Sequence, residues 1–390
     1  MPSICVVAGD PSGDAHAAGL VEALSRRVSG LTVAGLGGPA LRRAGATLFD
    51  DLTLAAAIGP FDAARHLSRF LQAKRLLETH LRTHRPDLVV LVDFGDFNLP
   101  VVAPLAKRYG IPVVYFISPQ LWAWGRWRLR YVQRYVDRML VLFRFEEEFY
   151  RRHGVAVTWV GHPLKDQARP TLSVQEAATQ IGLNPWRRTV GLLPGSRERE
   201  VARHLPLLLA TARHIAWQMP GIEFIVPRAS SIPPQWLTRY LQQSSCSIHI
   251  AEGPMPNALQ LMQAAIVASG TATLEAALCA VPMAVVYRTS WLTYLGARLV
   301  VRIPHIAMVN VMAQRRIVPE FVQHRVHPKR LAAAIIELLR DEERGERMRR
   351  DLREVSEQLG PPGAIDRAAS ALLDVLNSTH RAGSPRPGQD

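Results

Sequence analysis

The hydrophobic positions of this chain gather in short apolar runs separated by longer amphipathic stretches. Runs without polar alternation are typical of buried strands in a parallel sheet, and the stretches between them are long enough for helices. We expect strands in the first half at residues 4–8, 31–37, 87–94, 111–117, 138–143 and 157–161. After a segment rich in Pro and polar residues, further strands are expected at 189–194, 222–227, 247–251, 264–269 and 282–287. This alternation predicts an α/β protein with two Rossmann-like domains.

The interruption at 163–172 marks the expected domain boundary. We place the first domain at 1–165 and the second at 170–350. The leucine pattern of 329–377 is helical, and by analogy with other two-domain folds its last helix, at about 355–378, is expected to return to the first domain. Residues 380–390, rich in Gly, Pro and polar side chains, are expected to be a disordered tail.

Two segments of the second half predict a site for a phosphate-bearing sugar nucleotide. GLLPGSREREV (191–201) and ASGTATLEAAL (268–278) each lead from an expected strand into a helix, where unpaired backbone N–H groups and the helix dipole favour an anion. Arg197 can bond phosphate oxygens, and Glu275 can accept from two ribose hydroxyls. The alternative is an N-capped helix with a solvated arginine.

In the first half, the loops after the expected strands carry the candidate chemistry, because ligands of open parallel sheets lie beyond the carboxyl ends of the strands. In GDPSGDAH (9–16), Ser12 is a natural N-cap for the following helix. In VDFGDFN (92–98), Asp93 ends a strand and is our candidate general base, with Asp96 and Asn98 to orient it or hold an acceptor. The alternative is that both aspartates cap the following turn.

Aromatic and basic residues alternate after the next expected strand. If 124–138 is helical, Trp124, Trp127, Tyr131 and Tyr135 form one stripe and Arg126, Arg130 and Arg134 another. Such a surface suits a membrane interface or a phosphorylated lipid, and a buried helix with a solvated basic face is the alternative. His162, in GHPLKD (161–166), lies at the expected hinge, where a turn-capping role is equally open.

The chain has 390 residues, 48% of them hydrophobic, enough for two buried cores. Its formal net charge of +14 favours a polyanionic partner, such as nucleic acid, acidic phospholipid or a phosphorylated substrate. Cys5, Cys246 and Cys279 are too widely spaced for a disulfide framework or a zinc site, which favours a reducing compartment. No signal peptide is expected from the first residues.

Taken in order, these motifs resemble the lipid-A-disaccharide synthases, inverting glycosyltransferases of outer-membrane lipid assembly. The likeness covers nearly the whole chain: AGDPSGD (8–14), GGP (37–39), DFGDFN (93–98), SPQLWAW (118–124), FExxFY (145–150), GHPL (161–164), LLPGSRxxE (192–200), SGTATLE (269–275), PMAVVYR (282–288), Asn310 and VPEFVQ (318–323). The resemblance implies the GT-B fold, in which two Rossmann-like domains face each other across a cleft. The first domain would bind the lipid acceptor and the second the UDP-sugar.

The implied reaction transfers 2,3-diacylglucosamine from UDP to the 6-hydroxyl of 2,3-diacylglucosamine 1-phosphate, releasing UDP, with no metal ion and no cofactor. The resemblance places the protein on the cytoplasmic face of the inner membrane, attached peripherally to its anionic surface and binding no nucleic acid; a homodimer is left open. The expected catalytic residues are Asp93, Asp96 and Ser12. The expected UDP-sugar residues are Gly195, Ser196, Arg197, Glu200, Ser269, Gly270, Thr271, Thr273, Glu275, Arg288 and Asn310. The expected acceptor residues are Asp10, Asn98, Ser118, Trp122, Trp124 and His162.

Two other classes stay open at this point. One is another GT-B protein that uses UDP-N-acetylglucosamine, either a different transferase or a 2-epimerase. The other is a non-enzymatic basic nucleotide-binding protein, which explains the charge but not the candidate base. Residues 54–64 are smaller than the bulky apolar run that the family carries there, which leaves the acyl-chain length and the lipid contact of this segment undecided.

Overall fold

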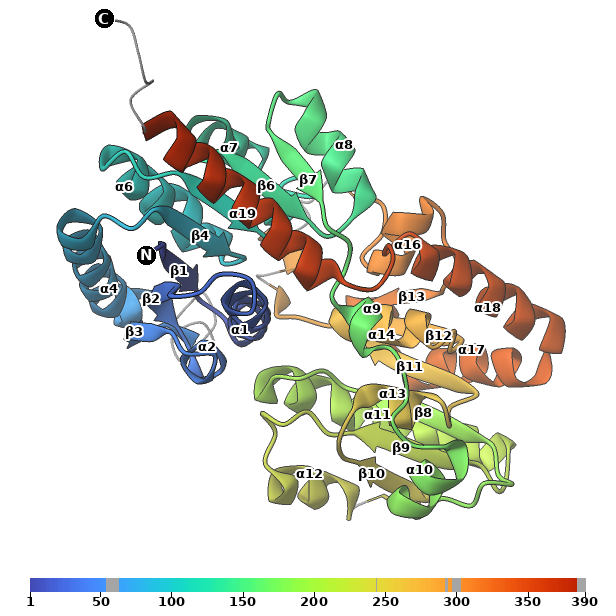
Figure 1. Ribbon diagram of the computed structural model, residues 1–390. Helices are drawn as coiled ribbons and strands as arrows, with labels where there is room; N and C mark the ends of the chain where they lie inside the picture. Colours follow the sequence, from blue (N-terminus) through green and yellow to red (C-terminus); the bar gives the residue numbers. More distant parts are fainter. Residues whose placement is uncertain (54–62, 243, 292–293, 297–302, 384–390) are drawn as a thin grey trace, which may run out of the picture. The chain divides into compact units, whose positions relative to one another are not determined.

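The computed structural model describes residues 1–53, 63–242, 244–291, 294–296 and 303–383, with the side chains of 63–67 and 379–383 excepted. The chain forms two compact units (Figure 1): Met1–Pro163 with Leu359–Asp390, and Leu164–Gln358. The expected lipid contact at 54–64 lies outside the described side chains, as does most of the expected tail at 380–390, although helix α19 continues to Gly383. Among the described residues, no helix is both long and apolar enough to cross a bilayer.

The first unit contains a seven-stranded sheet in which all the pairings are parallel, in the order β3-β2-β1-β4-β5-β6-β7. The strands are β1 (Ser3–Ala8), β2 (Thr32–Gly37), β3 (Thr47–Asp51), β4 (Leu88–Val92), β5 (Val113–Phe116), β6 (Arg138–Val141) and β7 (Val157–Trp159). The strand order reverses between β1 and β4, which is the point where open parallel sheets bind ligands.

Helices connect these strands and cover the sheet (Figure 1). They are α1 (Pro11–Ser25), α2 (Pro39–Arg43), α4 (Ala63–His84), α5 (Gly95–Phe97), the π-helix η2 (Asn98–Val102), α6 (Ala103–Arg108), the 3₁₀ helix η3 (Arg126–Arg128), α7 (Leu129–Tyr135), α8 (Arg144–Arg152) and α19 (Ala364–Gly383). The last of them, α19, packs against α1. Its Asp366 pairs at 2.6 Å with Arg27, which follows α1, and its Arg367 guanidinium donates at 2.8 Å to the carbonyl of Val160, which follows β7. The C-terminal segment is thereby part of the first unit's fold.

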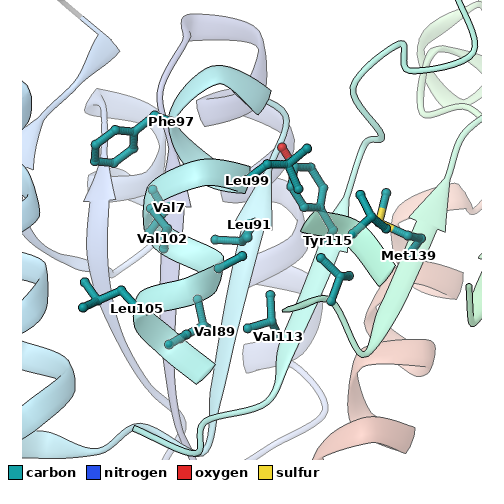
Figure 2. Packing of buried hydrophobic residues seen from close by; sticks show 14 of the residues in the cluster. Val7, Val89, Leu91, Phe97, Leu99, Val102, Leu105, Val113, Tyr115 and Met139 are labelled. Carbon is teal, nitrogen blue, oxygen red and sulfur yellow. The ribbon is translucent and has the colours of Figure 1, made fainter. Parts of the chain in front are cut away.

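The core of the first unit lies beneath the carboxyl ends of β4 and β5. Every residue of β4 is buried, and Leu99, Val102 and Leu105 from the following helices pack onto the same cluster (Figure 2). Tyr115 of β5 is fully buried among them, with its hydroxyl at the edge of the cluster (Figure 2). The loop that follows β4 therefore rests on a close-packed base.

The second unit contains a six-stranded parallel sheet in the order β10-β9-β8-β11-β12-β13. Its strands are β8 (Thr189–Leu193), β9 (Glu223–Pro227), β10 (Ile248–Ala251), β11 (Ala264–Ala268), β12 (Met283–Tyr287) and β13 (Glu320–Val322). Its helices are α9 (Leu164–Gln167), α10 (Val174–Ile181), α11 (Glu198–Gln218), α12 (Pro234–Leu241), α13 (Met255–Leu259), α14 (Thr271–Leu278), α16 (Met308–Ala313), the 3₁₀ helix η4 (Gln323–Arg325), α17 (Pro328–Arg340) and α18 (Glu342–Glu357). The order reverses between β8 and β11, so the two segments expected to bind the nucleotide follow neighbouring strands.

Every strand expected from the apolar runs is present. Two further strands, β3 and β13, were not expected, and both lie at sheet edges. The stretch 124–138 is not one helix: the 3₁₀ helix η3 precedes a short α7, and Trp124 lies before both.

Candidate active site

The first half-site lies at the reversal point of the first sheet, where Asp93 directly follows β4. Asp93 and Phe94 both have left-handed backbones, with φ of 45° and 50°. This conformation costs a non-glycine residue about 1–3 kcal/mol. The Asp93 Oδ1 accepts a hydrogen bond from the Phe94 N–H at 2.8 Å, and the Asp93 N–H donates to the Phe116 carbonyl at 3.1 Å. The half-buried carboxylate is thus fixed at the strand end by its own turn.

Two buried side chains hold the Asp93 backbone. The Tyr115 hydroxyl donates to the Asp93 carbonyl at 2.5 Å, and the Asn98 Nδ2 donates to the same oxygen at 2.8 Å. Asn98 is fully buried, with its amide on the Asp93 backbone; whether Asn98 orients Asp93 or holds an acceptor, its two expected roles, stays a prediction. The Asn98 Oδ1 is the one buried side-chain polar atom of the described residues that accepts no hydrogen bond, which costs stability for the sake of this geometry.

The loop after β1 is organised by two aspartates. Asp10, not Ser12, is the N-cap of α1: its Oδ1 accepts from the Gly13 N–H at 3.1 Å, while Ser12 is exposed in the first turn. The second aspartate, Asp14, was not singled out from the sequence. It is buried, and its carboxylate accepts backbone N–H bonds at 2.7, 2.8 and 3.1 Å from residues 38, 40 and 41, which fixes the GGP loop to α1.

Gly9 allows the loops after β1 and β4 to approach each other. A Cβ at Gly9 would lie 2.1 Å from the Phe94 ring, so any larger residue would displace the turn that carries Asp93. The two loops therefore form one rigid surface.

Asp96 forms an ion pair instead of facing Asp93. Its Oδ1 lies 2.6 Å from the Arg128 guanidinium, and the Arg128 guanidinium carbon lies 4.4 Å from the Trp124 ring centroid. The Asp96 side chain is 75% exposed, whereas that of Arg128 is 10% exposed. The pair connects the loop after β4 to the aromatic segment that follows β5.

The SPQLWAW segment interlocks with the FExxFY segment of α8. The Ser118 Oγ lies 2.6 Å from the Tyr150 hydroxyl, and both residues are buried. The expected contact between Ser118 and an acceptor stays a prediction. The Trp122 Nε1 donates to the Glu146 Oε1 at 3.2 Å. Burial raises the pKa of Glu146 to about 8, and the nearby Asp93 charge also raises it. Sequence reasoning missed Glu146, although it stands within the motif.

His162 lies at the end of the first unit and is buried against Phe143, with ring centroids 5.4 Å apart. The backbone N–H of His162 donates to the Leu359 carbonyl at 2.9 Å. Burial lowers the pKa of His162 to about 3, and the neighbouring His16 also lowers it. His162 is therefore neutral at physiological pH.

The second half-site begins where β8 leads into α11. Gly195 has a φ of 117°, and a Cβ there would lie 2.7 Å from the Glu200 carboxylate. The Glu200 Oε2 accepts from the Ser196 N–H at 3.3 Å, and its Oε1 lies 3.7 Å from the Arg197 guanidinium. Ser196 and Arg197 are exposed at the start of the helix. Glu200 thus bonds an N–H group at the expected anion position.

The equivalent loop after the neighbouring strand β11 leads into α14 through Ser269, Gly270 and Thr271. Gly270 and Thr271 are exposed. Thr273 is fully buried, and its hydroxyl donates to the Gly270 carbonyl at 2.7 Å. The expected contact of Thr273 with the UDP-sugar stays a prediction. Glu275 is half-buried and borders a small pocket of the second unit, and burial raises its pKa.

A buried histidine joins two loops of this half-site and was not predicted. The His204 Nδ1–H donates to the Pro194 carbonyl at 3.0 Å, and its Nε2 accepts from the Arg288 N–H at 3.2 Å. These two bonds require the neutral ring, and burial lowers the pKa of His204. The loop after β8 is thus tied to Arg288 at the end of β12. No motif in the sequence marks His204.

Asn310 and Glu320 connect α16 to the segments on either side of it. Asn310 is fully buried: its Nδ2 donates to the Val318 carbonyl and the Glu320 carboxylate, and its Oδ1 accepts from the Ile317 and Val318 N–H groups at 2.8 and 3.0 Å. Its expected contact with the UDP-sugar stays a prediction. The Glu320 Oε1 also accepts from the Ala307 N–H at 2.9 Å. Glu320 lies within VPEFVQ, a segment that carries the family resemblance but to which the sequence analysis assigned no role.

Comparison with known proteins places the chain in a family. A family model described as lipid-A-disaccharide synthetase matches residues 4–375. The chain is 40% identical over 373 residues to the lipid-A-disaccharide synthase of Geobacter sulfurreducens, covering 96% of this chain and 97% of that protein. It is 39% identical over 377 residues to the synthase of Syntrophus aciditrophicus, covering 96% and 98%.

Solved structures share the fold at low sequence identity. A putative UDP-N-acetylglucosamine 2-epimerase from Listeria monocytogenes matches with a TM-score of 0.65 and 14% identity, over 100% of this chain and 99% of that one. CalG4, the calicheamicin glycosyltransferase, matches with a TM-score of 0.61 and 18% identity, over 98% and 100%. The expected GT-B fold is confirmed, and this chain belongs to the lipid-A-disaccharide synthase family of glycosyltransferases.

Proposed function

We propose that this protein transfers 2,3-diacylglucosamine from UDP to the 6-hydroxyl of 2,3-diacylglucosamine 1-phosphate. Family membership supports the reaction class, and the observation that carries the mechanism is the fixed carboxylate of Asp93 at the reversal point of the first sheet. A general base at this position gains from the rigid loop, because proton transfer requires hydrogen-bond distance to the attacking hydroxyl.

In the proposed step, Asp93 takes the proton of the acceptor 6-hydroxyl while the oxygen of that hydroxyl attacks the anomeric carbon of the donor sugar. The new C–O bond forms as the bond to the β-phosphate oxygen of UDP breaks. The attack from the opposite face inverts the anomeric centre, and the electron pair leaves with UDP. Asp10 and the exposed Ser12 belong to the loop beside Asp93 and are proposed to contact the acceptor.

We infer that the second unit holds the leaving diphosphate. The N-termini of α11 and α14 follow neighbouring strands, and Arg197 is exposed at the first of them. An incoming diphosphate would compete with Glu200 for the Ser196 N–H. Arg197, Arg288 and the helix N-termini then stabilise the negative charge that develops on UDP. Glu275 is proposed to accept from the ribose hydroxyls.

Peripheral binding at the cytoplasmic face of the inner membrane belongs to the same proposal, because both substrates carry acyl chains. The formal net charge of +14 favours an anionic lipid surface. A homodimer stays a prediction.

The test uses full-length protein with UDP-2,3-diacylglucosamine and 2,3-diacylglucosamine 1-phosphate in detergent, with EDTA present. Mass spectrometry of the disaccharide and an assay of released UDP give the readout. Disaccharide formation in EDTA would support both the reaction and its independence from metal. UDP binding without disaccharide would contradict the proposed acceptor, and activity only after a divalent ion is added would contradict the proposed role of Arg197.

A further inference from the structure

Aromatic and arginine side chains alternate along one side of α7 and the 3₁₀ helix before it. We call Trp127, Arg130, Tyr131, Arg134 and Tyr135 the ladder. The Arg130 guanidinium carbon lies 5.7 Å from the Trp127 ring centroid and 5.2 Å from that of Tyr131, and the Arg134 carbon lies 5.4 Å from Tyr135. The rings follow one another at 6.1 and 6.2 Å. Arginine and aromatic residues therefore form one mixed surface, not the two separate stripes expected from the sequence.

The ladder is rigid on one side and exposed on the other. Tyr131 and Tyr135 pack against the hydrophobic core of the first unit. Trp127 is 58% exposed, and Arg130 and Arg134 are exposed. The ladder thus offers an exposed indole and two exposed guanidinium groups on elements that are anchored in the core.

The charge of this segment is strongly positive. Residues 126–138 contain five arginines and a single carboxylate, that of Asp137. Asp137 pairs with Lys107 at 2.6 Å, and Asp96 lies against Arg128. These two carboxylates are therefore paired with Lys107 and Arg128, while Arg130 and Arg134 are exposed and Arg130 lies beside the indole.

We propose that the ladder is the surface through which this protein docks on an anionic phospholipid bilayer. Tryptophan prefers the membrane–water interface, and each arginine near an anionic surface adds attraction. The choice of a bilayer as the binding partner rests on the proposed function, because acylated substrates are supplied from a bilayer. Single-stranded nucleic acid fits less well, since Tyr131 and Tyr135 stack on neighbouring side chains and on the core and do not offer open ring faces to bases.

The position of the ladder relative to the first half-site supports this inference. Arg128 contacts the Trp127 ring at 5.4 Å and pairs with Asp96, three residues after Asp93. The docking surface therefore begins beside the loop of the candidate base, within the same unit. An acceptor leaving the bilayer at the ladder would reach the base without crossing the rest of the molecule.

The experiment measures vesicle flotation of the full-length protein and of two matched double variants. Vesicles are phosphatidylcholine with roughly one-third phosphatidylglycerol, compared with pure phosphatidylcholine, at about 0.1 M salt. The ladder variant is W127S/R130S. The control variant is R213S/W217S, which removes the same residue types from exposed positions of α11, where Trp217 is 82% exposed.

We expect the ladder variant to lose affinity for the anionic vesicles by at least about fivefold, and the loss to shrink as salt rises. The control variant should bind as the parent protein does. Equal binding by both variants would overturn the proposal, as would a parent protein that does not bind anionic vesicles. Loss of single-stranded RNA binding with unchanged vesicle binding would assign the ladder to nucleic acid instead.

Transfer in detergent separates this inference from the proposed function. The ladder residues lie outside the proposed catalytic and binding residues, so W127S/R130S should form disaccharide in detergent at the parent rate. If neither the parent nor the variants form disaccharide but the ladder variant still binds anionic vesicles more weakly than the control variant, the proposed function fails and the docking surface stands. If disaccharide forms but the vesicle difference is absent, only the docking surface fails.

Discussion

At the scale of single residues, Asp93 can be tested without disturbing its turn. Asp93→Asn keeps an Oδ1 that accepts the Phe94 N–H, while the basicity of the carboxylate is lost. We expect kcat to fall by about 10²–10⁴, with UDP affinity unchanged because the proposed UDP residues belong to the other unit. Steady-state kinetics and calorimetric titration of UDP provide the check. Near-normal turnover in Asp93→Asn, together with loss in Asp96→Asn, would transfer the role to Asp96.

His204 gives a prediction on substrate affinity and pH. Replacing His204 by Leu leaves the Pro194 carbonyl and the Arg288 N–H without their partner, and the loss at the buried Pro194 carbonyl costs about 1–3 kcal/mol. We expect a higher KM for the UDP-sugar and little change in kcat, since the ring positions two binding loops and touches no reacting atom.

The same ring should make UDP binding sensitive to acid. Protonation of the His204 Nε2 would set an N–H against the Arg288 N–H, and Glu200, Arg203 and Arg288 are the charges that act on the ring. Because the pKa is lowered from 6.5, UDP affinity should hold down to that pH and weaken only below it. Titrations over pH should show this loss in the parent and in His214→Leu, a control on the same helix. An identical acid loss in His204→Leu would reject the assignment.

At the scale of elements, the site depends on segments that interlock far apart in the sequence. Ser118 and Tyr150 join the loop after β5 to α8 through one buried hydrogen bond. We expect Tyr150→Phe and Ser118→Ala to destabilise the protein by about 1 kcal/mol each, and the double variant by less than the sum. Urea unfolding of the four proteins measures the coupling. Additive losses would mean that the two elements are held together elsewhere.

The sequence predicts the elements better than it predicts the contacts between them. Central strands such as β4 are buried on both faces and stand out as apolar runs, whereas the edge strands β3 and β13 include acidic residues and are only partly buried. The loops after the strands were expected to carry the site because open parallel sheets bind ligands beyond the carboxyl ends of their strands, but the strand order and its reversal points were not predicted. Asn98 and Asn310 were among the expected site residues, and both are buried. The identity of a polar residue in the sequence does not indicate whether its side chain is buried or bonded to a partner distant in the chain.

At the scale of the whole molecule, two buried groups of the first unit act on stability in opposite directions. Burial holds the pKa of Glu146 near 8, above its ordinary 4.5, so the folded protein binds more protons than the unfolded chain between these values. Burial holds the pKa of His162 near 3, below its ordinary 6.5, so the folded protein binds fewer protons between those values. The free energy of unfolding therefore falls with rising pH through Glu146 and rises with pH through His162.

Between pH 4.5 and 6.5 these slopes oppose each other and nearly cancel, and above pH 6.5 the Glu146 slope acts alone. We expect Tm to be highest and nearly constant between those two pH values, and the unfolding free energy to fall above pH 6.5 by up to about 1.4 kcal/mol per pH unit until about pH 8. Glu146→Gln should flatten this alkaline decline, because the amide cannot ionise while its oxygen still accepts from Trp122. Thermal melts of the parent, Glu146→Gln and the exposed control Glu148→Gln across this range provide the measurement. A decline that persists unchanged in Glu146→Gln would assign it to another group and show that Glu146 ionises in the folded protein much as it does in the unfolded chain.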